Sequence, residues 1–397
     1  TAKAEDSNGN TLTVEYQKAD GSWTTDPSEI TATNVADTKT VNVRVSGETN
    51  YTGYVYGTQK LEITKRKVTL KSETASKTYD GTPLTKPDVT VTGDGFVDGE
   101  VSDIKANGSV TYVEDGEVTN DITYTKGDNF KESNYNIVKY EGKLHIVAIT
   151  TQITVTAQSG EKVYDGTPLT KQGVTYTANV LLDGDSLVAT VSGSRTDVGS
   201  SKNVVTGVKV MRGKQNVTEN YTFGEYQDGT LEVTPREIEL TSGSAEKTYD
   251  GTPLTKNEVT VTKGSFVEGE GFDYNVTGSQ TYVGYSENTF TYTAKEGTKT
   301  KLTNYAVTPK LGKLNVKQSA DEITITAPSA SRKYNGSPLT LTSGATYTGK
   351  LAKGDVLRVT LTGSQTNVGS SAVTVAEYRV IRTVDGEKKD VTANYKF

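Results

Sequence analysis

The sequence lacks the residue types on which most catalytic and metal-binding chemistry depends. It contains no cysteine and one histidine, His145, which excludes disulfides, thiolate zinc sites and a Ser-His-Asp set in each part of the chain. No apolar run approaches the ~20 residues of a membrane-spanning helix. The formal net charge of -6 has the wrong sign for wrapping nucleic acid, which needs a basic stripe. We therefore expect no enzyme, no cofactor, no metal site, no nucleic-acid partner and no membrane insertion by this segment.

The abundant residues favour β-structure. Threonine makes up about one residue in six, and the 23 tyrosines far outnumber the 7 phenylalanines. Threonine and valine are β-branched residues that suit a pleated, half-buried surface, and tyrosine rings reach from a thin core to water. Only 33% of the residues are hydrophobic, which indicates several small cores instead of one large core. The composition therefore predicts an all-β protein.

A ten-residue phrase recurs along the chain at a fixed interval. Lys77–Lys86, with the sequence KTYDGTPLTK, returns unchanged at 247–256 and with valine in place of its first threonine at 162–171, and a weaker copy starts at Arg332. Such a period is the signature of a repeat architecture. The conserved-looking positions of the phrase are Tyr79, Asp80, Gly81, Pro83, Tyr164, Asp165, Gly166, Pro168, Tyr249, Asp250, Gly251, Pro253, Tyr334, Asn335, Gly336 and Pro338. Two other markers recur with it: Thr-x-Val, starting at Thr33, Thr111, Thr196, Thr281 and Thr366, and Asn-Tyr, at Asn50, Asn134, Asn220, Asn304 and Asn394.

The repeats predict a tandem array of about five small Ig-like β-sandwich domains. Short period-2 runs such as Leu187–Val191 alternate with Asp-Gly and Asn-Gly turns, as in all-β sandwiches. At the first boundary the apolar positions change from odd (Leu61, Ile63) to even (Val68, Leu70), which moves the buried set to the other face and indicates a new core. No Gly/Ser or Pro-rich linker separates the repeats, so we expect an elongated rod. The expected domains are 1–65, 66–149, 150–235, 236–318 and 319–397, of which the last four alternate between a kind A and a kind B.

Both end repeats are expected to be incomplete. The chain starts at Thr1 instead of methionine, and the first repeat lacks the Tyr-Asp-Gly phrase. The fifth repeat reaches Phe397 without the Gly-x-Leu-x-(Val/Ile) closing strand that begins at Gly142, Gly229 and Gly312 in the three repeats before it. Two interpretations are open. The sequence is a piece of a longer chain, or a partner donates the missing strand to an open sheet edge.

The Lys-x-Tyr-Asp-Gly-Thr-Pro phrase, with its Asn-Tyr and Gly-x-Leu-x-Val ending, resembles the YDG and MBG (mostly-β, glycine-rich) repeats of bacterial surface proteins. The first repeat, with Asp20-Gly21-Ser22-Trp23 and Asn50-Tyr51-Thr52-Gly53, resembles the Ig-like variant that precedes them in Gram-positive cell-wall proteins. The resemblance implies a β-sandwich module placed outside the cell, at the bacterial surface, with no catalytic residue. The fifth repeat departs from it at Asn335 and Ser337, which keeps the turn chemistry but removes a carboxylate.

Two functions follow as expectations. The first is a structural stalk or spacer of a cell-surface adhesin, which projects a functional domain away from the cell wall as a monomeric rod. The alternative is a set of adhesive repeats that themselves bind host glycan, mucin or matrix protein, through exposed tyrosine or tryptophan side chains. The sequence does not show which aromatic side chains are exposed, so both functions remain open at this stage.

The Tyr-Asp-Gly phrase itself is interpreted as a turn. We expect its aspartate to accept backbone hydrogen bonds, its glycine to adopt a positive φ, and its tyrosine to pack near a domain junction with the hydroxyl satisfied. The alternative is a repeated ligand contact. A second element, acidic-Gly-acidic, is interpreted as a polar hairpin turn, with calcium binding as the alternative; its copies are Asp98-Gly99-Glu100, Asp183-Gly184-Asp185 and Glu268-Gly269-Glu270, with Lys353-Gly354-Asp355 in the fifth repeat.

Three further hypotheses concern single side chains. Lys-Asn isopeptide bonds are an alternative use of Lys77, Lys162 and Lys247 with Asn134, Asn220 and Asn304, although Arg332 in the fifth repeat could not form one. A lysine beside a turn is normally solvated, so we expect these lysines to be exposed. His145 is expected to be exposed on its strand, and Trp23 is expected to pack within the first repeat, with sugar stacking as the alternative.

Overall fold

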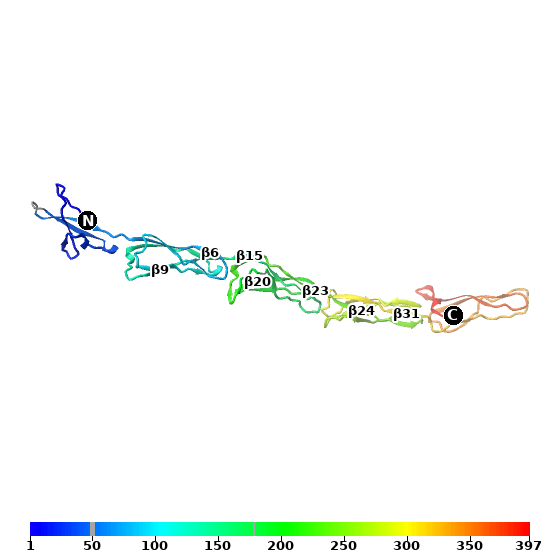
Figure 1. Cartoon of the computed structure of the whole chain (residues 1–397). Coiled ribbons are helices and arrows are strands. Elements are labelled where there is room, and N and C mark those ends of the chain that lie inside the picture. Colours follow the sequence, from blue (N-terminus) through cyan, green and yellow to red (C-terminus); the bar gives the residue numbers. More distant parts are fainter. Residues whose placement is uncertain (48–51, 178) are drawn as a thin grey trace. The chain divides into compact units, whose positions relative to one another are not determined.

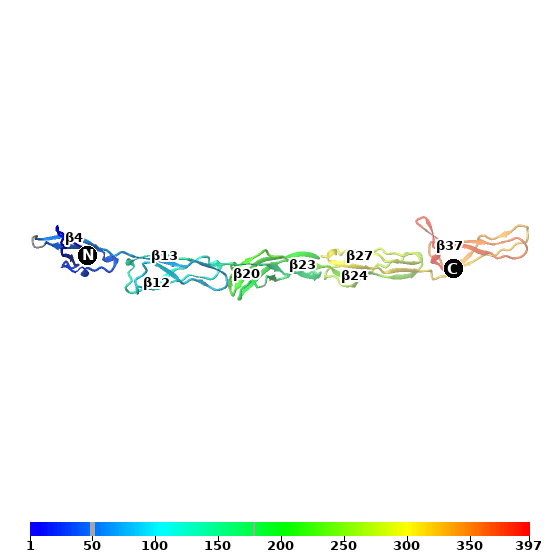
Figure 2. The same cartoon turned by 45° about the horizontal axis from the view of Figure 1, so that its top comes forward.

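The computed structural model describes residues 1–47, 52–177 and 179–397, and this part of the chain is all-β, with many small sheets (Figure 1, Figure 2). Its only helical segments are single 3₁₀ turns. Asn50 and Tyr51, on which one sequence marker and part of the resemblance rest, lie outside the described residues. Among the described residues, no helix has the length and apolar character needed to cross a membrane.

The described chain forms two compact units, and the boundary between them passes through the third repeat. The first unit consists of Thr1–Thr156, Val174–Thr190 and Val205–Gln227, and the second of Ala157–Gly173, Val191–Val204 and Asp228–Phe397. The third repeat therefore contributes strands to both units. Each unit contains complete contacts between successive repeats, which are described below.

The first repeat is one antiparallel sheet with the strand order β2-β1-β3-β4. Its buried residues include Tyr16 and Val41. The Arg44 guanidinium lies over the Trp23 ring, 4.2 Å from its centroid, and pairs with Glu15 at 2.7 Å. The elements are β1 (Val14–Gln17), β2 (Trp23–Thr24), η1 (Pro27–Glu29), η2 (Val35–Asp37), β3 (Lys39–Ser46) and β4 (Tyr54–Leu61).

The second repeat pairs its first strands with its last strands in parallel. β5 runs parallel to β13, and β6 runs parallel to β14 in a separate sheet. Val68 and Leu70 of β5 are fully buried and cluster with Ile122 and Tyr135. The elements are β5 (Arg66–Ser72), β6 (Ala75–Thr78), β7 (Leu84–Thr85), β8 (Val89–Gly93), β9 (Val101–Ala106), β10 (Ser109–Val110), η3 (Val113–Asp115), β11 (Val118–Thr119), β12 (Ile122–Lys126), η4 (Glu132–Asn134), β13 (Tyr135–Tyr140) and β14 (Lys143–Val147).

A glycine is required just before or at the start of each closing strand, where the chain passes from one sheet to the other. A Cβ added at Gly142 would lie 2.1 Å from the Glu73 carbonyl oxygen, a distance that no side chain tolerates. The Gly142 N–H donates to the buried Ser72 hydroxyl at 2.9 Å, and that hydroxyl donates to the Asn120 carbonyl at 2.7 Å. Gly312 and Ser242 repeat this arrangement in the fourth repeat. The closing-strand glycine is therefore explained by close backbone approach.

The third and fourth repeats keep the parallel pairing. β17 is parallel to β23 in the third repeat, and β24 to β30 and β25 to β31 in the fourth. The third repeat contains β15 (Ile149–Ile153), β16 (Val155–Ala157), β17 (Gly160–Val163), β18 (Val174–Tyr176), β19 (Asp185–Ser192), β20 (Gly199–Arg212), β21 (Gln215–Asn216), η5 (Thr218–Asn220), β22 (Tyr221–Phe223) and β23 (Gly229–Thr234). The fourth contains β24 (Arg236–Ser242), β25 (Ala245–Thr248), β26 (Val259–Lys263), β27 (Phe272–Val276), β28 (Gly284–Glu287), β29 (Phe290–Ala294), η6 (Leu302–Asn304), β30 (Tyr305–Lys310) and β31 (Lys313–Lys317).

The fifth repeat has fewer paired strands. Its largest sheet has the order β35-β37-β38. Its elements are β32 (Thr324–Thr326), β33 (Leu339–Thr340), β34 (Thr346–Thr348), β35 (Asp355–Thr362), β36 (Ser364–Gln365), β37 (Thr374–Val384), β38 (Glu387–Asp390) and η7 (Thr392–Asn394). Neither 330–333 nor 369–373 belongs to a strand.

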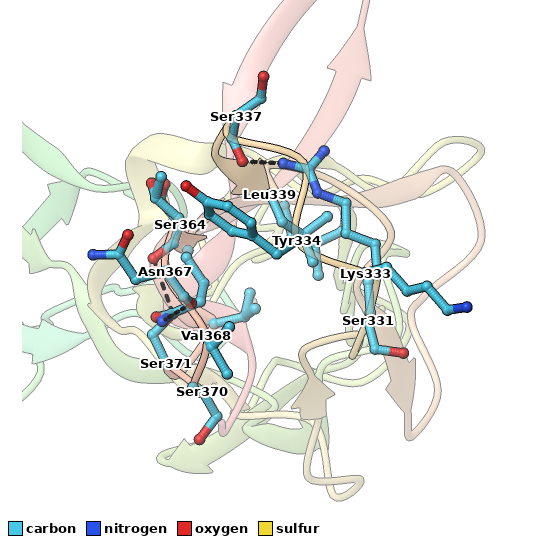
Figure 3. A pocket seen from close by; sticks show the side chains of 18 residues that line it. Ser331, Lys333, Tyr334, Ser337, Leu339, Ser364, Asn367, Val368, Ser370 and Ser371 are labelled. Atoms are coloured by element: carbon cyan, nitrogen blue, oxygen red, sulfur yellow. Dashed lines mark hydrogen bonds between the residues drawn. The ribbon is translucent and has the colours of Figure 1, made fainter.

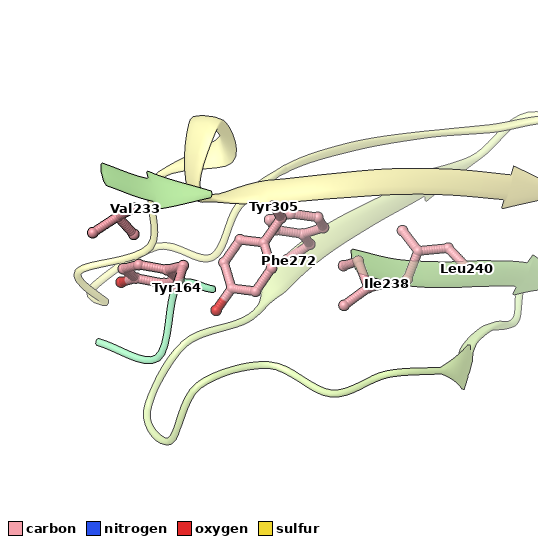
Figure 4. Close-up of a cluster of buried hydrophobic side chains, with 6 residues drawn as sticks. All are labelled: Tyr164, Val233, Ile238, Leu240, Phe272 and Tyr305. Atoms are coloured by element: carbon pink, nitrogen blue, oxygen red, sulfur yellow. The ribbon is translucent and has the colours of Figure 1, made fainter. Parts of the chain in front are cut away.

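The hydrophobic cores of the second unit continue from one repeat into the next. Tyr164 and Val233 of the third repeat cluster with Ile238, Leu240, Phe272 and Tyr305 of the fourth (Figure 4). In the same way Tyr249 and Val316 of the fourth repeat join the core that contains Val380 and Tyr395 of the fifth. The expectation that each repeat starts a wholly new core is therefore wrong at these boundaries, because the last strand and the motif tyrosine cover the start of the next core.

Candidate functional site

The Tyr-Asp-Gly phrase forms the expected tight turn in all four copies. The Thr82 N–H donates to Asp80 Oδ1 at 2.9 Å, and in the fifth repeat the Ser337 N–H donates to Asn335 Oδ1 at 3.1 Å. The amide oxygen of asparagine therefore replaces the carboxylate in this role. The glycine has a positive φ each time, a conformation that costs glycine little: 80° at Gly81, 79° at Gly166, 78° at Gly251 and 84° at Gly336.

A lysine two residues before the tyrosine closes the turn in the first three copies. Lys162 Nζ lies 2.6 Å from Asp165 Oδ1 and 2.8 Å from Thr167 Oγ1. This hydrogen bond lowers the pKa of the Asp165 carboxyl to about 2. The side chain of Lys162 is only 20% exposed, so the expectation of a solvated lysine is wrong. The isopeptide alternative has no support, because each lysine pairs with the aspartate of its own turn and each marker asparagine has the partner described below.

The first three motif tyrosines are buried, and each hydroxyl lies beside a carboxylate of the following repeat. All three residues are at most 4% exposed. The carboxylates come from the third position of the acidic-Gly-acidic element or its Lys-Gly-Asp variant. The distances from hydroxyl to carboxylate oxygen are 3.4 Å for Tyr79 and Asp185, 2.6 Å for Tyr164 and Glu270, and 3.0 Å for Tyr249 and Asp355.

The same carboxylate accepts a second hydroxyl, from the Asn-Tyr tyrosine of its own repeat. The distance is 2.6 Å for Tyr221 to Asp185, for Tyr305 to Glu270 and for Tyr395 to Asp355. The two tyrosine rings meet edge to face, with centroids 5.5 to 5.9 Å apart, which is a favourable arrangement of aromatic rings. We call this three-residue contact the tyrosine clasp.

The clasp changes the interpretation of the acidic loops. In the third to fifth repeats their last acid is not a solvent-facing turn residue, because two phenol hydroxyls donate to its carboxylate. Among the described residues no group of three or more His, Cys, Asp or Glu side chains is placed to hold a metal ion. The calcium alternative therefore has no support in the described part of the chain.

An arginine completes the clasp in the two B repeats. Arg212 Nε lies 2.7 Å from Asp185 Oδ1, as an ion pair without hydrogen-bond alignment, and Arg382 Nε donates to Asp355 Oδ1. Both aspartate side chains are fully buried. Arg382 also donates to the carbonyl of Gly251 in the preceding repeat. The B repeats thus bury a charge pair at the boundary, where Glu270 of the fourth repeat has, among the described residues, two hydroxyl partners and no arginine.

The Asn-Tyr asparagine makes a second link to the preceding repeat. Its Oδ1 accepts the backbone N–H of the valine in the Thr-x-Val marker, and Asn220, Asn304 and Asn394 are at most 3% exposed. The three sequence markers therefore meet at one place, the contact between successive repeats. The N–H to Oδ1 distances are 2.9 Å for Val35 and Asn134, 2.7 Å for Val113 and Asn220, 2.9 Å for Val198 and Asn304, and 2.9 Å for Val283 and Asn394.

The fifth repeat presents the equivalent surface without a partner among the described residues. Tyr334, the fourth motif tyrosine, is 65% exposed, and Val368 of the last Thr-x-Val marker is 91% exposed. In the second to fourth repeats the corresponding tyrosines are covered by the next repeat. The difference in exposure between Tyr334 and the other three motif tyrosines therefore shows that contact with the following repeat buries those three side chains.

The clasp predicts a loss of stability at high pH. Burial, followed by the hydrogen bond to Glu270, raises the pKa of Tyr164 from 10.0 to about 12, and burial raises the pKa values of Tyr221, Tyr249, Tyr305 and Tyr395 further. Because the folded pKa is the higher one, this contribution to stability is complete below pH 10 and is lost as the pH rises through about 12. Tyrosinate absorbance should show a late phase that coincides with unfolding. A single phase near the pKa of free tyrosine, with the fold retained, would contradict the clasp.

The role of the last acid in each acidic-Gly-acidic loop was not predicted from the sequence, although the sequence contains a signal for it. In Lys353-Gly354-Asp355 the first acid is replaced and the last is kept, which separates a turn residue from one with a specific partner. The distance in sequence from motif tyrosine to acid is also constant, 106 residues in each of the three clasps. Sequence alone gives no reason to pair two positions so far apart.

The predictions for the side chains of Trp23 and His145 have different outcomes. Trp23 packs against Tyr56, with ring centroids 6.0 Å apart, and under Arg44, as expected of a packing residue. His145 is half-buried and its Nδ1 is buried without a hydrogen-bond partner, so the expectation of an exposed histidine is wrong. The reason is that β14 is the central strand of the sheet β11-β14-β6, with a neighbour on each side.

Comparisons with known proteins add little to this geometry. No family model matches the chain, and no curated protein matches it. Among solved structures, the chain is similar to Drosophila N-cadherin EC1-4, with 10% sequence identity over 80% of this chain and 94% of that chain and a TM-score of 0.17. At that TM-score the likeness carries no argument about fold or function, which must rest on the residues described above.

Proposed function

We propose that this chain is a structural stalk of a bacterial cell-surface adhesin. In this proposal the five sequence repeats are small Ig-like β-sandwich domains that follow one another as an elongated, monomeric rod outside the cell. The rod holds a functional domain at a distance from the cell wall. Its role is mechanical, and this role depends on the residues that fix each repeat to the next.

The observation that carries the proposal is that the same side-chain contacts recur at successive boundaries. The tyrosine clasp occurs three times and the asparagine link four times. The connections are also short, since β14 ends at Val147 and β15 begins at Ile149, and β23 ends at Thr234 and β24 begins at Arg236. Short connections with buried polar contacts favour a stiff spacer over a flexible tether.

Small-angle X-ray scattering of the whole chain tests the stalk. At about 3.3 Å per strand residue, each repeat would extend roughly 35–40 Å, and the rod would have at least about twice the ~21 Å radius of gyration of a compact globule of this length. The double variant Glu270→Ala/Asn304→Ala should remain folded but show a broader distribution of lengths. A compact wild-type particle, or a variant with an unchanged distribution, would contradict the proposal.

Adhesive binding is the second candidate, and one observation favours it. Tyr285 is 68% exposed, its ring lies 5.1 Å from Lys313 Nζ, and both line a shallow groove with Glu246 and Asn315. Exposed aromatic rings with polar neighbours are suited to sugar stacking. Binding of the whole chain to an array of host glycans and matrix proteins should then be lost in Tyr285→Ala and kept in Tyr140→Ala, an equally exposed tyrosine (61%).

A further inference from the structure

Three asparagine-glycine pairs occur in the sequence: Asn8-Gly9, Asn107-Gly108 and Asn335-Gly336. In such a pair the backbone nitrogen of the glycine can attack Cγ of the asparagine side chain, because no Cβ shields that nitrogen. The attack closes a five-membered succinimide ring and releases the side-chain nitrogen as ammonia. Water then opens the ring to aspartate or to isoaspartate. How readily each pair reacts depends on whether the structure holds the glycine nitrogen.

The glycine nitrogen is held by a hydrogen bond in the first two pairs. The Gly9 N–H donates to the Asp6 carbonyl at 3.0 Å. The Gly108 N–H donates to Oδ1 of the buried Asn120, also at 3.0 Å, and Gly108 itself is buried. The nitrogen must lose its proton and turn toward Cγ before it can attack, so each of these bonds opposes ring closure.

The glycine nitrogen of the third pair has no such restraint. The Gly336 N–H donates to no backbone acceptor among the described residues. A Cβ built on Gly336 would have no atom within 4 Å apart from its chain neighbours, so the space around this backbone is open. The Ser337 N–H donates to Asn335 Oδ1 at 3.1 Å, which draws electron density away from Cγ. The geometry therefore favours ring closure at this pair over the other two.

Solvent reaches the turn of the fifth repeat, since Asn335 and Gly336 are both exposed. This exposure is a property of the turn itself. In the second to fourth repeats, each of which contacts a following repeat, the aspartate side chain at the same position is still 46 to 56% exposed. Those aspartates are protected from the same ring closure. The hydrogen bond of the lysine lowers the pKa of each carboxyl to about 2, and an ionised carboxylate is a poor target for a nucleophile.

We propose that Asn335-Gly336 is a site of spontaneous deamidation, which converts the turn of the fifth repeat to the Asp-Gly form of the second to fourth repeats. The Gly336 nitrogen forms a bond to Asn335 Cγ, and the Cγ–Nδ2 bond breaks, so that Nδ2 leaves as ammonia with the proton from Gly336. Water then adds at one carbonyl of the ring. Addition at Cγ breaks the new bond and gives aspartate with the original backbone, whereas addition at the main-chain carbonyl gives isoaspartate.

The fifth repeat already contains a cation placed to pair with the new carboxylate. Arg332 takes the position of the lysine, and its Nη2 donates to the Ser337 carbonyl (Figure 3). In the third repeat Lys162 Nζ lies in the same way 2.5 Å from the Thr167 carbonyl oxygen, and it also lies 2.6 Å from Asp165 Oδ1. An aspartate formed in the fifth repeat would therefore gain an ion pair with the arginine, which an uncharged amide cannot make.

The test follows the whole chain over time in mildly alkaline buffer that keeps it folded, with digestion and mass spectrometry of each sample. We expect the peptide with Asn335 to deamidate roughly tenfold faster than the peptides with Asn8 or Asn107, which is about the factor by which one ordinary hydrogen bond raises a barrier. In denaturing urea the three rates should converge, because the hydrogen bonds at Gly9 and Gly108 are lost. Digested Asn335→Asp protein supplies the reference that separates aspartate from isoaspartate.

Three outcomes would overturn the proposal: an intact Asn335 after the other two pairs have reacted, the same ratio of rates in the folded and the unfolded chain, or isoaspartate as the only product. Asn335→Gln is the matched variant, because its longer side chain would have to close a six-membered ring. It should lose conversion at this site while Asn107 converts as before, and unchanged hydrogen exchange in the other repeats would show that it remains folded.

The predicted ion pair has a separate readout. In the Asn335→Asp protein the pKa of the new carboxyl, followed by NMR, should lie below its usual range, and the added substitution Arg332→Gln should raise it again. The same pKa with and without the arginine would show that the product turn is not closed by this pair.

Discussion

Asp355→Ala should destabilise the fifth repeat by about 3–5 kcal/mol, the cost typical of removing one partner of a buried ion pair. The Asp355 side chain is fully buried and accepts hydrogen bonds from the hydroxyls of Tyr249 and Tyr395 and from Arg382. Its removal leaves a guanidinium that is only 13% exposed without its carboxylate, together with two phenols that lose an acceptor. Urea unfolding with hydrogen exchange at β35 and β37 would measure the loss.

Two control variants separate the charge from the hydroxyl contacts. Glu270→Ala removes the acceptor of two tyrosine hydroxyls but leaves no buried arginine without its carboxylate. We therefore expect a smaller loss in the free energy of unfolding, about 1–3 kcal/mol. Asp321→Ala removes an exposed carboxylate of the fifth repeat and should change the free energy of unfolding by less than about 0.5 kcal/mol. Equal losses for Asp355→Ala and Asp321→Ala would show that the clasp contributes nothing to stability.

Leu314→Ala should destabilise the fourth repeat by about 2–5 kcal/mol, through lost burial and the cavity that remains. Leu314 is fully buried on β31, between β25 and β28. A small repeat has few large apolar side chains, so few neighbouring side chains can repack to fill the cavity. Thermal unfolding and exchange at β25 and β31 would report the change.

Leu311 supplies the matched control for this substitution. It lies three residues earlier and is 39% exposed, so Leu311→Ala should cost no more than about 0.5 kcal/mol. If the two leucine variants lost the same stability, the burial of Leu314 between its neighbouring strands would be wrong.

The sequence was sufficient for the strands and for the turns. The change from Leu61 and Ile63 to Val68 and Leu70 predicted a new core at that boundary, and Val68 and Leu70 of β5 are fully buried in a cluster with Ile122 and Tyr135. These features depend on period-2 burial and on the local chemistry of Asp-Gly turns. Both can be recognised from residues that are close together in the sequence. The all-β class follows from the same local signals.

The contacts between repeats could not be derived in the same way. A period-2 pattern shows which face of a strand is buried but not which strand lies beside it, so the parallel pairing of β5 with β13 was not predicted. The clasp of Tyr164 with Glu270 joins residues 106 positions apart, and neither residue has a local reason to choose the other. The markers showed where the boundary residues are, whereas the structure shows that they belong to one contact.

The parallel pairing of the first and last strands has a mechanical consequence. In the second repeat the chain enters through β5 and β6 and leaves through β13 and β14, which pair with them in register. Tension on the two ends would slide these strands past each other, so that the hydrogen bonds of both ladders share the load and cannot open one at a time like a zipper. Such shear loading should make a small, weakly apolar repeat hard to pull apart even when its equilibrium stability is modest.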